Sequence, residues 1–325
     1  MYKTNIQDRF LNEIKKKLPA NNSLAYAIED TLHVSLDSVY RRIRGTTLIN
    51  VEEIELLCRR FGVSMDALLS ENSDNVLFRQ AQTNDNEQES LKLKLAFIVE
   101  FMEILAAGKD CYIKYPTLDI PFFHYAQFPE LMLFRIYVWH RSINKWEKMT
   151  FEKFLETYNS NENTTFFKKI ADASKKIQIT EIWTLNTLSP LINYLEYYSD
   201  LNLFEDNSIL ASLCGQTLEL IEYIRNCTEN KCQDFSGKKT PFELYLSSID
   251  FSNSTMLSGY NDIKTVSLMP LPISLMYSDD KKLSNINEES ITDLISKSNS
   301  INGASEKERL KFFSKLKEKV LKLNN

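Results

Sequence analysis

Apolar residues recur at three- and four-residue steps through the first seventy positions, with polar residues between them. This spacing puts apolar side chains on one face and predicts short amphipathic helices. The first helix is predicted to end before Pro19, the second to open at Asn21–Ser23, and the third to span Ser35–Gly45. Two more are predicted to begin at Asn50 and Ser64. Five helices in about seventy residues is roughly the minimum that buries a core without metal or disulfide.

The predicted helix ends carry recognisable stop and start signals. A Ser35 hydroxyl can accept an unpaired backbone N–H at the start of the third helix, and Gly45 can close it. Asn50 and Glu53 form the sequence pattern of a capping box at the start of the fourth. Only His33 and Val34 separate the second and third helices. Helices joined so tightly must cross at a steep angle, which is helix-turn-helix geometry.

The third predicted helix has two different faces. Leu36, Val39 and Ile43 fall on one side, and Asp37, Arg41 and Arg44 fall on the other. An apolar underside with an arginine-bearing outer side suits a helix that packs on a small core and enters a major groove. The alternative interpretation is a charged face that is simply solvated.

Residues 28–69 resemble the lambda-repressor-like (Cro/C1-type, XRE) helix-turn-helix family. The matching features are Leu32-His-Val-Ser35, Ser38-Val39, Arg41, Arg44-Gly45, Glu52 to Leu57 and Phe61 to Leu69. The chain departs from the family pattern at Glu29, His33 and Ile43, where a small residue, a glycine and often a glutamate are usual. It also lacks the usual proline-bearing loop between Thr46 and Asn50. The resemblance implies a five-helix DNA-binding domain over residues 1–70.

The resemblance also implies which side chains contact DNA. Arg41 can donate two hydrogen bonds to guanine O6 and N7, and Asp37 can accept from cytosine N4. Tyr40 can contact a thymine methyl group or a phosphate, and Arg44 corresponds to a position beside the DNA backbone. Backbone N–H groups at a helix start suit a phosphate oxygen. The candidate DNA-binding residues are therefore Asn22, Ser23, Ser35, Leu36, Asp37, Tyr40, Arg41 and Arg44.

Residues 71–90 are rich in polar side chains and are predicted to be a linker, and residues 91–325 form a larger domain. Helical spacing dominates that domain, including 182–198 and a helix predicted to start at Thr240-Pro241. Short alternating stretches predict only a small β hairpin or sheet near 253–277. The predicted fold class is therefore mostly α: a five-helix helix-turn-helix domain followed by a larger, mainly helical one.

Three parts of the larger domain have two interpretations each. The apolar helix Leu91–Ala107 is either a dimer seam or, slightly favoured, ordinary core packing. The aromatic stretch 112–146 is either a ligand pocket or, favoured, a large aromatic core. The basic helix Ser305–Leu323 contacts phosphate or, favoured, is a docked surface helix. Cys111, His124 and His140 lack metal-ligand spacing, and no cofactor is expected.

Charge is divided unevenly along the chain. Residues 1–70 carry 10 Lys and Arg against 9 Asp and Glu, whereas the remainder carries 29 against 35, within a net charge of −5. An acidic remainder is not expected to lie along phosphate. Five cysteines are an odd number, and no signal peptide or apolar segment of about twenty residues is visible. These features predict a reduced, cytoplasmic protein with no membrane segment.

No phosphate-binding loop, nucleophile elbow or other catalytic motif is present in the sequence, so an enzyme is not predicted. The sequence predicts a transcription regulator that binds double-stranded DNA through its first domain. The second domain is expected to form a homodimer or to sense a small-molecule or peptide effector. The alternative hypothesis is a protein-interaction adaptor that uses the helix-turn-helix unit as a docking module.

Overall fold

The chain forms two compact units, unit 1 (Met1–Leu77) and unit 2 (Phe78–Asn325). The structure, a computed structural model, describes residues 5–18, 22–69, 76–83, 86–143, 149–249, 251, 255–270 and 273–324, with backbone only at 67, 142, 143, 207 and 324. The division between the units lies within the predicted linker 71–90. Pro19, Asn21, residues 71–75 and 84–85 of that linker, Trp146 and residues 253–254 lie outside the described residues.

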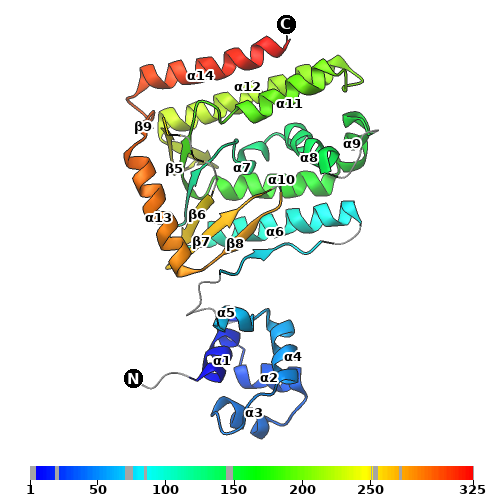
Figure 1. Cartoon of the computed structure of the whole chain (residues 1–325), viewed down its shortest axis with the longest axis vertical. Helices are drawn as coiled ribbons and strands as arrows, with labels where there is room; N and C mark the ends of the chain where they lie inside the picture. The colour runs from blue at the N-terminus through cyan, green and yellow to red at the C-terminus, as the bar shows by residue number, and fades with distance from the viewer. Residues whose placement is uncertain are drawn as a thin grey trace. The chain divides into compact units, whose positions relative to one another are not determined.

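Unit 1 consists of short helices (Figure 1). They are α1 (Ile6–Lys17), α2 (Leu24–Leu32), α3 (Leu36–Ile43), α4 (Val51–Phe61) and α5 (Met65–Leu69). Apolar side chains on one face of these helices point inward. The core consists of Phe10, Leu11, Ile14, Ala25, Ile28, Val39, Ile49, Leu57, Val63 and Leu68.

The helix ends in unit 1 follow from local chemistry. The Ser35 hydroxyl accepts the Ser38 backbone N–H at 3.4 Å, and Asn50 and Glu53 complete a reciprocal capping box. Gly62 ends α4 with a φ of 62°, in the left-handed region that glycine tolerates. His33 ends α2 in the same region, with a φ of 54°, so the α2–α3 turn forms there without glycine.

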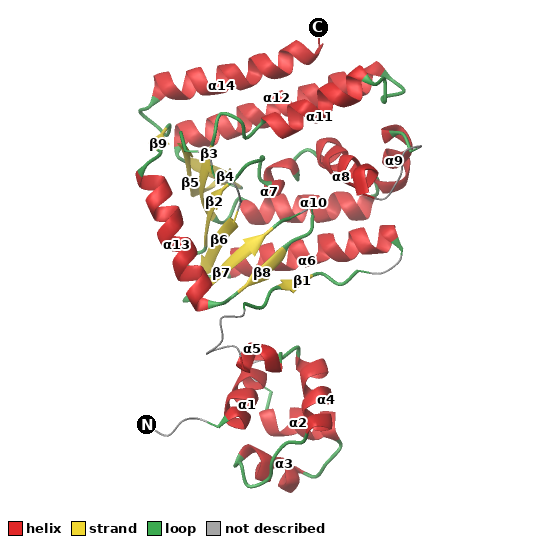
Figure 2. Cartoon of the chain, viewed as in Figure 1, coloured by secondary structure: helices red, strands yellow, loops and turns green. Residues whose placement is uncertain are grey.

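Unit 2 combines long helices with a large sheet (Figure 2). Its helices are α6 (Glu87–Ala107), α7 (Phe122–Tyr125), α8 (Pro129–Ile143), α9 (Phe151–Tyr158), α10 (Asn161–Ser174), α11 (Ser189–Asp200), α12 (Asn207–Asn230), α13 (Lys281–Ser296), α14 (Glu306–Leu321) and the 3₁₀ turn η2 (Lys322–Asn324). Its strands are β1 (Arg79–Gln80), β2 (Tyr112–Pro116), β3 (Gln178–Trp183), β4 (Cys232–Phe235), β5 (Lys238–Leu246), β6 (Thr255–Tyr260), β7 (Ile263–Leu268), β8 (Met276–Ser278) and β9 (Asn299–Ser300).

These strands form one nine-stranded mixed sheet in the order β1-β8-β7-β6-β2-β3-β5-β4, with β9 also paired to β5. Strands β2, β3 and β5 are parallel, and the others pair antiparallel. The predicted mostly-α fold class is therefore wrong. The predicted small hairpin or sheet near 253–277 corresponds to β6, β7 and β8, which are only one side of a larger sheet.

Two segments predicted as helices contain central strands. The predicted helix 182–198 begins with the end of β3, and α11 starts only at Ser189. The segment after Thr240-Pro241 continues β5, in which Phe242 and Leu244 are fully buried. Five of the six residues of β3 are buried, so this strand does not show a simple alternation of apolar and polar residues. In β5 buried and less buried residues do alternate, and there the error came from reading Thr240-Pro241 as a helix cap.

Helices cover both faces of the sheet. On one face Ile113, Ile179 and Phe242 join a core with residues of α6, α8, α10 and α12. On the other face Ile182, Leu257 and Val266 pack with Ile291 of α13. The apolar side of α6 packs inside unit 2, beside α10. None of the helices in the described part of the chain has the length and apolar character that crossing a bilayer requires.

Candidate nucleic-acid interface

Four side chains of α3 and its end share one exposed side of unit 1. At about 100° per residue, Asp37, Tyr40, Arg41 and Arg44 fall within an arc of about 100° around the helix axis. All four are exposed, and Tyr40 keeps 47% of its surface accessible. Val39, on the opposite side, is fully buried. We call these four residues the α3 surface.

Contacts within the α3 surface orient its arginines. Arg41 Nη2 lies 2.9 Å from Asp37 Oδ2, one helical turn away, while both side chains stay more than 60% exposed. Arg44 Nε donates to the backbone carbonyl of Tyr40 at 3.2 Å. Both guanidinium groups therefore keep most of their N–H donors directed to solvent. The surface presents two cations and one carboxylate on a short helix.

The other candidate residues have different positions. Leu36 is half-buried and packs against the core of unit 1, and Ser35 uses its hydroxyl as a cap. Asn22 and Ser23 are exposed at the start of α2, and Ser23 makes no side-chain capping bond. Within the described residues, no hydrogen bond or ion pair joins Asn22 or Ser23 to the α3 surface.

Arg42 points away from the α3 surface and toward α4. Its Nη2 and Nε lie 2.5 and 3.0 Å from Glu53 Oε1 and Oε2, and both side chains are only 13–14% exposed. The hydrogen bond from Arg42 lowers the pKa of the Glu53 carboxyl, and the same bond raises the pKa of Arg42. Arg42 thus connects α3 to α4.

Gln7 was not recognised in the sequence as a residue that positions α3. Its side-chain amide donates to the carbonyls of Arg42 (2.8 Å) and Thr47 (3.0 Å) and accepts from the N–H of Ile49 (2.9 Å). It therefore holds the segment after α3 against α1. The available signal was its helical position, since Gln7 shares a face with Leu11 and Ile14 of the core.

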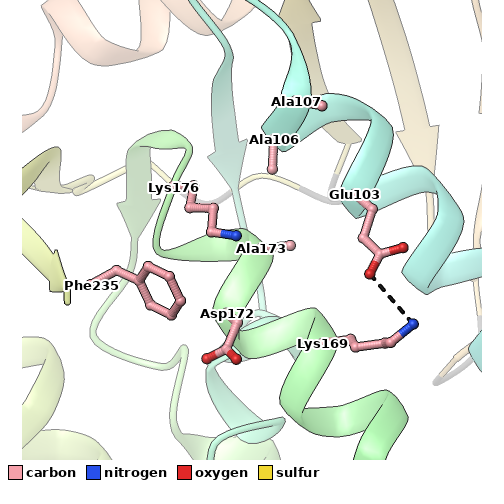
Figure 3. A pocket seen from close by; sticks show the side chains of 8 residues that line it. All are labelled: Glu103, Ala106, Ala107, Lys169, Asp172, Ala173, Lys176 and Phe235. Atoms are coloured by element: carbon pink, nitrogen blue, oxygen red, sulfur yellow. Dashed lines mark ion pairs between the residues drawn. The ribbon is translucent and has the colours of Figure 1, made fainter. Parts of the chain in front are cut away.

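A cleft of about 290 Å³ lies on unit 2, between α6, α10 and β4 (Figure 3). Figure 3 shows Lys169 and Asp172 of α10, Lys176 just after that helix, and Ala106 and Ala107 at the end of α6. Lys169 lies 3.6 Å from Glu103, and Lys176 Nζ lies 4.9 Å from the ring centre of Phe235. Two of its cations thus interact with neighbours in the cleft wall.

The aromatic stretch forms packed core rather than an open pocket wall. Phe134 and Tyr137 are fully buried and contact Phe151 edge-on or tilted, at 5.3–5.4 Å between ring centres. His124 Nε2 lies 2.6 Å from Glu181 Oε1, and the indole of Trp183 donates to Glu181 Oε2 at 2.7 Å. All three side chains are at most 1% exposed. They form a closed polar cluster within the core.

Cysteine and histidine side chains do not assemble a metal centre in the described part of the chain, where no group of three or more His, Cys, Asp or Glu is placed to hold an ion. Cys111, Cys227 and Cys232 are free thiols. Burial raises the pKa of the Cys227 thiol to about 12, so it is protonated and unreactive at neutral pH.

No protein-family model matches the chain, and no curated protein matches it.

Proposed function

We propose that the chain is a DNA-binding transcription regulator of the lambda-repressor-like type, in which α3 reads the major groove. The observation that carries the proposal is the α3 surface. It presents two arginines and a tyrosine on the outer side of a helix whose inner side is fixed in a core. Gln7 and the Arg42–Glu53 pair hold that helix to α1 and α4. A short helix held on several sides can present base-reading groups in a fixed register.

The chemistry of each side chain suits a duplex. The fork of Arg41 matches guanine O6 and N7, and a good bidentate pair contributes about 1–3 kcal/mol of discrimination. Asp37 either accepts from cytosine N4 or restrains Arg41. Arg44, at the end of α3, suits a phosphate, which positions the helix without reading sequence. Tyr40 offers both a ring and a hydroxyl.

A second candidate function is docking on another protein. The observation favouring it is the exposure of two apolar residues after α3, because Leu48 is 71% and Val51 81% accessible. Exposed apolar residues that lie close together can mark an interaction site. In this case Leu48→Ser and Val51→Ser remove partner binding and leave DNA binding unaffected.

The deciding experiment is selection of bound DNA from a random pool with the full chain, followed by affinity measurements on the selected duplex. Arg41→Ala is expected to weaken specific binding about 5- to 150-fold, equivalent to 1–3 kcal/mol. Arg44→Ala is expected to lower the slope of log affinity against log salt by about 1. Arg59→Ala is the matched control, because Arg59 is a highly exposed arginine of α4 that also pairs with a carboxylate one turn away.

Unchanged affinity and salt slope in both Arg41→Ala and Arg44→Ala would refute the proposal.

We propose further that unit 2 makes the chain a homodimer or receives a small-molecule or peptide effector. A dimer of helix-turn-helix units binds half-sites about one helical turn apart. A two-fold-symmetric selected motif, together with a dimeric mass in solution, supports that arrangement, and an asymmetric motif with a monomeric mass contradicts the homodimer.

A further inference from the structure

The helix α14 has two sharply different sides. Its inner side is buried and consists of Arg309, Phe312, Phe313, Leu316 and Val320. It packs along α12, and Figure 1 shows the two helices side by side near the C-terminus of the chain. Lys317 Nζ lies 2.6 Å from Glu222 of α12, and Lys319 Nζ lies 3.3 Å from the Ser189 hydroxyl. These two lysines therefore contribute to packing within unit 2.

The outer side of α14, together with Lys322 at the start of η2, carries a row of lysines. Lys307, Lys311, Lys315 and Lys322 are exposed, and at about 100° per residue they fall within an arc of about 80°. We call these four residues the lysine row. No hydrogen bond or ion pair joins their side chains to another residue in the described ranges. Glu318 lies within the same arc and Glu308 at its margin, so four ammonium groups face two carboxylates.

Although residues 71–325 are acidic as a whole, the lysine row is locally cationic, and we propose that it binds the phosphate backbone of double-stranded DNA as a second contact that does not depend on sequence. Lys307, Lys311 and Lys315 are about 6 Å apart along the axis, Lys322 follows about 10 Å further on, and the row is about 22 Å long. That length equals roughly six base pairs, each of which carries two phosphates. Lysine is a flexible point charge and needs no fixed geometry to contact a phosphate oxygen. The choice of DNA as the ligand of the lysine row rests on the proposed function, in which α3 already binds a duplex.

A duplex fits this surface better than an anionic membrane does. A helix that lies in a membrane interface inserts an apolar face among the lipids. The apolar face of α14 is already occupied by α12, as the burial of Phe312 and Phe313 shows. Leu310 and Leu321 are exposed but lie about 16 Å apart along the axis, so they form no continuous apolar stripe.

The test uses the full chain and a 30-base-pair duplex of random sequence, with affinity measured by fluorescence anisotropy across a range of KCl concentrations. The row variant carries Lys307→Gln, Lys311→Gln, Lys315→Gln and Lys322→Gln. The control variant carries Lys153→Gln, Lys168→Gln, Lys281→Gln and Lys297→Gln, which are exposed lysines on, or directly after, other helices of unit 2. Both variants change the net charge equally, so any difference reports position. Thermal unfolding checks that both are folded.

In the row variant the slope of log affinity against log salt is expected to fall by about 2 to 3.6, which corresponds to about 0.9 per lost phosphate contact. In the control variant it is expected to change by less than about 0.5. Equal slopes in the two variants, or a row-dependent binding to vesicles of phosphatidylcholine and phosphatidylglycerol without an effect on DNA, would overturn the inference. If Arg41→Ala and Arg44→Ala change nothing while the row variant lowers the slope, the proposed function fails and the lysine row stands.

Discussion

The side-chain amide of Gln7 donates a hydrogen bond to the backbone carbonyl of Arg42 at 2.8 Å, from α1 to the last turn of α3. The same side chain bonds Thr47 and Ile49 of the following segment. A single side chain thus satisfies the Thr47 carbonyl and the Ile49 N–H, and it adds a second donor to the Arg42 carbonyl, which also accepts from the Gly45 N–H at 3.0 Å. The direction of the chain after α3 therefore depends on the Gln7 amide, which supplies both a hydrogen-bond donor and an acceptor.

Replacing Gln7 with leucine is expected to destabilise unit 1 by about 2–4 kcal/mol, because the Thr47 carbonyl and the Ile49 N–H lose their partner and the Arg42 carbonyl loses one of two. Urea unfolding followed by far-UV circular dichroism measures the change. Asn12→Leu is the matched control on the exposed side of α1, with an expected change within about 0.5 kcal/mol. Equal effects of the two substitutions would show that the bonds of Gln7 do not stabilise the unit.

The Arg42–Glu53 pair is expected to show strong energetic coupling. Either Arg42→Ala or Glu53→Ala leaves a largely buried charge without its partner and should cost about 2–4 kcal/mol. The double variant should cost less than the sum of the single ones by about 1–3 kcal/mol. A double-mutant cycle in urea unfolding measures the coupling. For the exposed pair Arg59–Glu55 the coupling should stay below about 0.5 kcal/mol, and similar values for the two pairs would contradict the assignment.

The closed polar cluster in unit 2 predicts that the stability of the unit depends on which side chain occupies position 181. Glu181→Leu removes the acceptor for the Trp183 indole N–H and the partner of His124. It should therefore destabilise unit 2 by about 3–5 kcal/mol. Glu181→Gln keeps one acceptor oxygen and should cost less. Chemical unfolding monitored by tryptophan fluorescence tests the order, and a glutamine variant as unstable as the leucine variant would refute it.

Acid should weaken the contact between α12 and α14. Hydrogen bonds from Arg225 and then Lys317 hold the pKa of the Glu222 carboxyl at about 2, against an ordinary value of 4.5. Because the folded pKa is the lower one, this stabilisation is fully present above pH 4.5 and is lost as the pH falls toward 2. Glu222 is 38% exposed, so solvent screening limits the effect.

Glu222→Gln is accordingly expected to lower the free energy of unfolding by about 1 kcal/mol at pH 7. The difference from the unsubstituted chain should shrink as the pH falls from 4.5 toward 2. Unfolding in urea at several pH values measures it, with Glu156→Gln, on the exposed side of α9, as the control. A deficit that stays constant down to pH 3 would argue against the ionised contact.

Local signals in the sequence predicted the helices of unit 1 but not the sheet of unit 2. Capping residues such as Ser35, Asn50 and Gly62 act on their own neighbours, so their effect is visible in sequence. The central strand β3 is five-sixths buried, including the polar Glu181, and its register depends on β2 and β5, each more than sixty residues away. Pairing over such separations leaves no local mark. Thr240-Pro241 likewise matches a local helix-start pattern, whereas its place in β5 depends on pairing with the distant strand β3.

For the candidate interface, the sequence predicted which residues lie outward but not what positions them. Helical periodicity places four residues on one exposed side, namely Asp37, Tyr40, Arg41 and Arg44. The role of Gln7 depends on a loop that folds back from more than thirty residues away, and periodicity contains no such information. The direction of Arg42 is likewise determined by Glu53 of another helix, which the local sequence does not show.

The pairing of β1 with β8 has a consequence for synthesis of the chain. Arg79 of β1 donates a hydrogen bond to Asp279, which follows β8 and is synthesised 200 residues later. At about 5–20 residues per second, a ribosome needs about 10–40 s to make that stretch. In unit 1 the bond between Ile49 and Gln7 joins residues only 42 positions apart. The nascent chain can therefore fold its first unit before β8 is synthesised. During that time β1 has no strand to pair with, and the sheet of the second unit is incomplete.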